Sequence, residues 1–126
     1  CIYYGSEWGM EGKKNWNDTQ LRPEIKVFEW NELTDTIQKL INLKHHHSAL
    51  SYGDYTQIGI TNTACIYQRQ DEKECLWICM NMKSVVQTLG FNGQGNFIDM
   101  ETNEELYIHN SLEFKPYEVK LLKKVS

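Results

Sequence analysis

The order of apolar and polar positions divides the chain into three zones. Residues 1–28 open with a short apolar run, which predicts a strand over residues 1–5, and continue as a polar loop. In the second zone apolar residues recur at spacings of three and four, the period of one buried helical stripe. This stripe consists of Trp30, Leu33, Ile37, Leu40 and Ile41. Asn31 is suited to the N-cap of the helix, and residues 44–47 to its C-terminal end.

From Leu50 onward the apolar period changes to two, which predicts strands. The expected strands are residues 55–61, 64–69, 74–82, 96–100, 105–109 and 117–122. The charged residues 70–73 predict a turn. The glycine-rich residues 91–95 also predict a turn. A phosphate-binding loop is not expected there, because these residues lack the Lys and Ser or Thr of such a loop. Short strands at spacings of about ten residues indicate an antiparallel sandwich or barrel, so the predicted fold class is mainly β.

Length and charge narrow the class of protein. The chain has 126 residues, which suits one domain, or one small domain with a fragment of another. Its 17 acidic and 13 basic residues argue against non-specific nucleic-acid binding, which needs clustered Lys and Arg. No apolar run approaches the roughly 20 residues of a membrane-spanning helix, so no membrane partner is expected. A strand followed by one helix is half of a parallel unit, so we expect the numbering to begin inside a longer protein.

The four cysteines are Cys1, Cys65, Cys75 and Cys79, and three of them lie in apolar, strand-like runs. Buried free cysteine is common in cores, so we expect reduced thiols, which suit a cytoplasmic location. Cys75 and Cys79, taken with the histidines 45–47, suggest zinc. However, strand residues four apart stand about 13 Å from each other, whereas zinc needs ligands within about 2.3 Å of the ion. We therefore expect no metal or other cofactor in this chain.

Three stretches of the sequence resemble the α-amylase family, glycoside hydrolase family thirteen. Residues 2–12, which read IYYGSEWGMEG, are similar to that family's eighth barrel strand and the loop after it. Residues 41–50 look like its last barrel helix and exit, and residues 114–122 look like its final strand. Ser6 stands where many members have Asp, Lys44 where Arg is common, and Ser48 where Pro is usual. The departure at Ser6 bears on the subfamily.

The resemblance implies a retaining enzyme that acts on α-glucans or oligosaccharides and consists of a (β/α)8 barrel followed by a C-terminal β-sandwich. Residues 1–49 would be the last βα unit of a truncated barrel, and residues 50–126 the C-terminal antiparallel sandwich. Retaining glycosidases use two carboxyl groups about 5–5.5 Å apart. In this family these lie on earlier barrel strands, together with a third, stabilising carboxylate. No residue here matches those motifs, so we expect the chain alone to be inactive, and any calcium site to lie in the missing barrel.

The loop after the eighth strand helps to build the active site of barrel enzymes, so the chain can contribute a wall of that site. Asp18 and Arg22 resemble the family's D-x-x-x-R element, which in some members contacts a sugar. The alternative role of the two residues is a salt bridge within the loop. Trp8 and Trp16 are candidates for stacking on a sugar ring or, alternatively, for packing against barrel or sandwich. Glu7 and Glu11 are tempting as a catalytic pair, but the resemblance assigns Glu7 to a structural or rim position.

Three classes of function follow. The first is the C-terminal part of an α-amylase-family enzyme, whose partners are malto-oligosaccharide or α-glucan and the chain's own upstream barrel. The second is a free-standing carbohydrate-binding sandwich, which requires an exposed row of aromatic residues, whereas Trp77 lies in an apolar run and is expected to be buried. The third is a structural interaction domain without sugar affinity. Because the helical stripe loses its barrel partner in isolation, we expect the isolated chain to self-associate.

Overall fold

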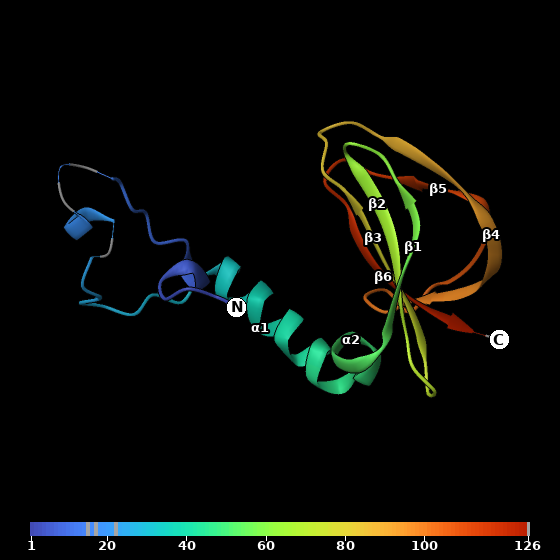
Figure 1. Cartoon of the computed structure of the whole chain (residues 1–126), viewed down its shortest axis with the longest axis horizontal. Coiled ribbons are helices and arrows are strands. Elements are labelled where there is room, and N and C mark those ends of the chain that lie inside the picture. Colours follow the sequence, from blue (N-terminus) through green and yellow to red (C-terminus); the bar gives the residue numbers. More distant parts are fainter. Residues whose placement is uncertain (15, 17, 22, 126) are drawn as a thin grey trace. The chain divides into compact units, whose positions relative to one another are not determined.

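The computed structural model describes residues 1–14, 16, 18–21 and 23–125. The chain forms two compact units, residues 1–46 and residues 47–126. The first unit is helical and the second is an antiparallel β unit, so the protein is mainly β, as the apolar pattern predicts (Figure 1). No helix in the described ranges is long and apolar enough to cross a membrane.

The helical unit contains two short 3-10 helices, η1 (Ser6–Trp8) and η2 (Asp18–Gln20), and the helix α1 (Glu32–His46). Asn31 caps α1 as expected, because its side-chain oxygen accepts the backbone N–H of Thr34 at 3.1 Å. The Thr34 hydroxyl in turn lies 3.3 Å from the backbone N–H of Asn31 and accepts from it, which completes a reciprocal cap.

The strand predicted over residues 1–5 is not formed, which corrects that expectation. Residues 1–4 are exposed and belong to no strand. A strand needs a neighbour to satisfy its backbone N–H and C=O groups, and the described part of this unit supplies none. The apolar stripe of α1 is also uncovered within its own unit: Trp30 and Leu40 are 65% and 57% exposed, and α1 has no buried residue.

The β unit begins with the short helix α2 (Ser48–Tyr52), which packs against the second and third of six strands. The strands are β1 (Asp54–Ile60), β2 (Ala64–Gln70), β3 (Cys75–Asn81), β4 (Gln87–Asp99), β5 (Glu105–Phe114) and β6 (Val119–Val125). They form one antiparallel sheet in the order β1-β2-β3-β6-β4-β5. This sheet curls, so that β1, β2, β3 and β6 form one side of the unit and β4 and β5 the other (Figure 1).

The hydrophobic core lies between the two sides of the curled sheet. Trp77 is 4% exposed, as its apolar surroundings predict, and its ring packs against Phe97 with centroids 4.4 Å apart. Phe97, Phe114, Ile66 and Leu122 are among the largest fully buried side chains. Burial of this kind contributes about 1.5–3 kcal/mol for each large apolar side chain, so the core supplies much of the stability of the unit.

Two details of the predicted strands are wrong. The glycine-rich residues 91–95 lie inside β4, where the pairing with β5 shifts register between Gly90 and Gln94, and they do not form a turn. The last strand also differs in its bounds, because β6 runs from Val119 to Val125 and not over residues 117–122. Leu122 is the fully buried residue of β6, because its register partner Trp77 faces the core.

Candidate functional site

The loop that follows the first residues is held against the start of α1. The Asn31 side chain donates to the backbone oxygen of Trp8 at 2.9 Å, and the Thr34 hydroxyl donates to that of Glu7 at 2.8 Å. Gly5 has φ +82°, in the left-handed region that glycine adopts readily, and a Cβ there would meet Met10 at 2.5 Å. The helix cap therefore positions η1 and its side chains as well as starting the helix.

The two tryptophans predicted to contact sugar are placed differently. Trp8 is half-buried and packs edge-on against Phe28, with ring centroids 5.8 Å apart. Trp16 is fully exposed, so both faces of its indole are open. An exposed, amphipathic ring can stack on the apolar face of a sugar, whereas the Trp8 ring already has a packing partner.

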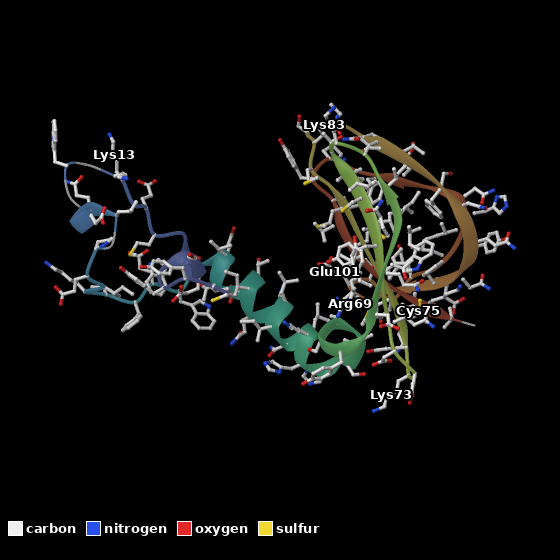
Figure 2. The ribbon with its side chains drawn as sticks, in the orientation of Figure 1. Lys13, Arg69, Lys73, Cys75, Lys83 and Glu101 are labelled. Atoms are coloured by element: carbon white, nitrogen blue, oxygen red, sulfur yellow. The ribbon has the colours of Figure 1, made fainter. Side chains whose placement is uncertain are left out.

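Of the predicted pair Asp18 and Arg22, the structure describes only Asp18. Asp18 is exposed at the start of η2, and its backbone oxygen accepts the N–H of Leu21 at 3.0 Å. The N–H of Lys13, which Figure 2 labels in this loop, donates to the backbone oxygen of Gln20 at 3.3 Å and closes its base. Arg22 lies outside the described residues, so its pairing with Asp18 and their contact with sugar stay predictions.

Glu7 and Glu11, considered above as a catalytic pair, lie in different environments. Glu11 is exposed, whereas Glu7 is half-buried and its Oε2 atom is buried without a hydrogen-bond partner in the described chain. A buried carboxylate oxygen without a donor is unfavourable, so Glu7 Oε2 is suited to accepting a hydrogen bond from a group outside the described residues.

In the β unit, Glu74 fixes the segment that leads into the strands. Its Oε2 atom lies 2.9 Å from His47 Nδ1 and 3.4 Å from Lys123 Nζ, and its Oε1 atom accepts the backbone N–H of Ala49 at 3.4 Å. Burial alone would raise the pKa of Glu74. The hydrogen bond and charge of His47, with the Ala49 and Lys123 contacts, outweigh that effect and hold this pKa below its ordinary value.

A second carboxylate fastens the same segment. The Ser48 hydroxyl and the backbone N–H of Lys73 donate to Asp71, and these two bonds lower its pKa. Arg69 Nε donates to the backbone oxygen of Ala49 at 3.2 Å, and Ala49 is fully buried. Figure 2 shows Arg69 beside α2 and Lys73 at the nearby end of the strands.

Sequence reasoning missed a groove at this end of the β unit. Its volume is about 550 Å³, and its lining includes Tyr52, Asp54, Thr56, Gln68 and Gln70. The available signal was the period of two: Gln68 and Gln70 continue the inward series of Ile66, and Asp54 and Thr56 oppose them across the strand pair. Polar residues at inward positions mark the point where the core opens to water.

All four cysteines are unpaired in the structure. Cys79 is fully buried, and burial raises the pKa of its thiol to about 12, so this thiol is inert at neutral pH. Across the residues that the structure describes, no group of three or more His, Cys, Asp or Glu side chains could hold a metal ion.

Known proteins resemble the chain in sequence over part of their length, although no family model matches it. The cyclomaltodextrin glucanotransferase of Geobacillus stearothermophilus is 34% identical over 84 residues, which cover 66% of this chain and 11% of that enzyme. The maltogenic α-amylase of Bacillus acidopullulyticus is 30% identical over 97% of this chain and 22% of that enzyme. The chain thus spans 11–22% of the length of the curated relatives it matches.

Solved structures share the fold. An α-amylase from Anoxybacillus superposes with a TM-score of 0.75 and 20% identity, over 98% of this chain and 28% of that one. AmyP, solved in complex with maltose, superposes with a TM-score of 0.63 and 23% identity, over 73% of this chain and 20% of that one. Taken with the residues 2–12 and 41–50 and with the curled antiparallel sheet, these findings show that the chain belongs to the α-amylase family and matches the C-terminal part of its enzymes.

Proposed function

We propose that the chain is the C-terminal part of a retaining enzyme that hydrolyses or transfers α-glucosidic bonds in α-glucans or malto-oligosaccharides. The catalytic acid, nucleophile and stabilising carboxylate belong to an upstream barrel. This chain stabilises that barrel and walls its sugar cleft. Membership of the α-amylase family supports the substrate class, and the maltose complex of AmyP is in keeping with it. The unpaired thiols support a cytoplasmic location.

The observation that carries this proposal is uncovered apolar surface in each unit. In the helical unit the α1 stripe is exposed, although its period is that of a helix face meant for burial. In the β unit the strand β3 is apolar at six consecutive positions, 75–80, whereas a sheet with one solvated face shows alternation. Two outward rows cross β2, β3 and β6 on that side: Tyr67, Ile78 and Leu121, and Cys65, Met80 and Val119.

These rows are suited to covering another part of the same enzyme. Val119 is 56% exposed and Ile78 is half-buried. On the same face Leu76 is fully buried, at the end of the sheet where α2 packs. Packing of another part of the enzyme on the two rows, as α2 packs at Leu76, would bury their apolar surface and stabilise the protein by about 25 cal/mol for each Å² buried. The Glu7 Oε2 atom, which has no hydrogen-bond partner among the described residues, is likewise suited to accepting a hydrogen bond from that part of the enzyme.

The loop of the helical unit is the segment that would form a wall of the sugar cleft. Trp16 offers an open ring to a sugar, and Asp18, with Arg22, offers an acceptor and a guanidinium donor for adjacent hydroxyl groups. Trp8 contributes by holding the loop through Phe28 and the α1 cap.

The first test is to determine the coding sequence upstream of Cys1 and to assay the encoded protein on maltotriose. We expect a barrel with the three carboxylate motifs, cleavage or transfer with retained anomeric configuration by NMR, and no turnover by residues 1–126 alone. An upstream sequence without such a barrel, or turnover by the chain alone, would overturn the proposal.

The stabilising role has a separate test in the encoded full-length protein. Ile78→Asp places a charge on the outward rows and should lower the free energy of unfolding by about 2 kcal/mol or more. The matched control is Ser111→Asp at an exposed position of β5, opposite Gly90, which should change it by less than about 0.5 kcal/mol. Equal effects of the two variants would contradict the role assigned to these rows.

A further inference from the structure

The groove at the open end of the β unit has an ordered polar lining. Asp54 faces Gln70 and Thr56 faces Gln68 across the β1–β2 pair, so two rungs of the sheet present polar side chains on one face. Beyond them lie Asp71 and Glu72 of the following turn, and Tyr52 at the end of α2. The volume of about 550 Å³ is within the range of small-molecule sites, about 300–1,000 Å³.

Several of these groups are held in place by the protein. The Trp77 indole donates to Gln68 Oε1 at 3.0 Å, and Gln68 Nε2 donates to Gln70 Oε1 at 2.9 Å, so the two amides form a chain anchored on a core tryptophan. Asp71 is fixed by Ser48 and by the N–H groups of Lys73 and Glu74. Groups that are already ordered lose little side-chain entropy when a ligand binds.

The chemistry of the lining selects among ligand classes. Asp54, Asp71 and Glu72 give the groove three carboxylates, which disfavour an anion. The described residues contain no group of acidic, His or Cys side chains placed to hold a metal ion. Carboxylates accept hydrogen bonds from hydroxyl groups, and amides both accept hydrogen bonds from them and donate to them. The Tyr52 side chain, 88% exposed, offers an apolar ring beside these groups. A neutral, polyhydroxylated ligand matches this combination.

We propose that this groove of the β unit binds a short segment of a neutral oligosaccharide, with Asp54 and Gln70 bonding adjacent hydroxyl groups and Tyr52 against a sugar ring. The choice of an α-glucan segment as that oligosaccharide rests on the proposed function. The groove is built wholly from the β unit, so binding to it requires no catalytic carboxylate.

Titration of the full 126-residue chain, labelled with ¹⁵N, with maltotriose tests the proposal by NMR. We expect saturable shifts of the backbone amides of Tyr52, Asp54, Gln68 and Gln70. Tyr52→Ala and the isosteric Asp54→Asn should each weaken binding by about tenfold, which corresponds to about 1.4 kcal/mol. The matched control is Tyr107→Ala, which removes a tyrosine that is 65% exposed on β5 and should leave the affinity unchanged.

Each other outcome overturns the proposal. These outcomes are no shifts in the groove, shifts confined to residues 8–21, an unchanged affinity in both groove variants whose spectra show an intact fold, or saturation by calcium chloride or inorganic phosphate in place of maltotriose. Failure here is separable from failure of the proposed function. Turnover of maltotriose by the full-length enzyme without groove binding rejects only the groove, and groove binding without turnover rejects only the enzymatic role.

Discussion

Asn81 joins three segments at the end of the β unit opposite the groove. Its side-chain nitrogen donates to the backbone oxygens of Val85 at 2.9 Å and Lys115 at 2.8 Å. Its side-chain oxygen accepts the Lys83 N–H and the Gln87 amide, each at 2.9 Å. Asn81 is 3% exposed, and Figure 2 marks Lys83 at this end. All the hydrogen-bonding capacity of this amide is therefore used within the protein, which makes it a sharp target for a conservative substitution.

Asn81→Asp keeps the shape of the side chain and replaces the donor by a second acceptor. Two hydrogen bonds are lost, at a cost of about 1–1.5 kcal/mol each. The buried carboxylate also faces two carbonyl oxygens, and its lost hydration adds about 1–2 kcal/mol. We expect the free energy of unfolding at pH 7 to fall by about 4 kcal/mol, a large part of the stability of a small domain.

The effect should depend on pH with a defined sign. Burial and the two carbonyl oxygens raise the pKa of the new carboxyl in the folded state above about 3.9, its value in the unfolded chain. The destabilisation is therefore complete at neutral pH. It shrinks as the pH falls through the folded-state pKa toward about 4, because the protonated carboxyl can donate to one carbonyl.

Urea unfolding of the full chain, followed by far-UV circular dichroism at several pH values, measures this effect. The matched control is Asn62→Asp, the same chemical change at an exposed turn position, which should alter stability by less than about 0.5 kcal/mol. A loss at residue 81 below about 1 kcal/mol, or a difference from the wild type that does not narrow at acidic pH, would refute the reasoning.

Four further results are expected. Gly53→Ala should destabilise the β unit by about 1–3 kcal/mol, because its Cβ would lie 2.6 Å from the backbone oxygen of Ala49, whereas Gly93→Ala, with ordinary contacts, should be nearly neutral in the same urea assay. Glu74→Gln should cost about 1–2 kcal/mol at pH 7. Since the pKa of Glu74 is lowered in the fold, this difference should begin to narrow as the pH falls below about 4.3, its unfolded-state value, and should close once the pH is below the folded-state pKa; a constant gap between the two urea midpoints would contradict this. Cys79 should not react with a chromogenic thiol reagent under native conditions, whereas the exposed Cys1 should react rapidly. If Cys79→Ser reduces the amplitude of the rapid absorbance change, Cys79 reacts in the native protein and the expectation is wrong. The exposed α1 stripe should cause the isolated chain to self-associate, and a clean monomer over a wide concentration range in analytical ultracentrifugation would contradict this.

The sequence by itself determined the local elements and the family. The three-and-four spacing from Trp30 to Ile41 predicted α1, and the capping role of Asn31 is confirmed by its bond to Thr34. The period of two placed a strand within each of β1 to β6, although it missed residues 87–95 of β4, and Trp77 is buried as expected. The stretch IYYGSEWGMEG by itself indicated the α-amylase family. These features rest on residues close in sequence, whose spacing fixes which side of an element they share.

Only the tertiary structure decided the features that depend on distant partners. The apolar residues 1–5 form no strand, because a strand requires a neighbour that the described part of their unit does not supply. The inward face of β6 was set by its pairing with β3, and residues 91–95 remain in a strand because β5 pairs on both sides of their irregularity. The groove exists because Asp54 and Gln70, 16 positions apart, become neighbours through an antiparallel register. Hydrophobic spacing specifies a face, but only the fold specifies what meets that face.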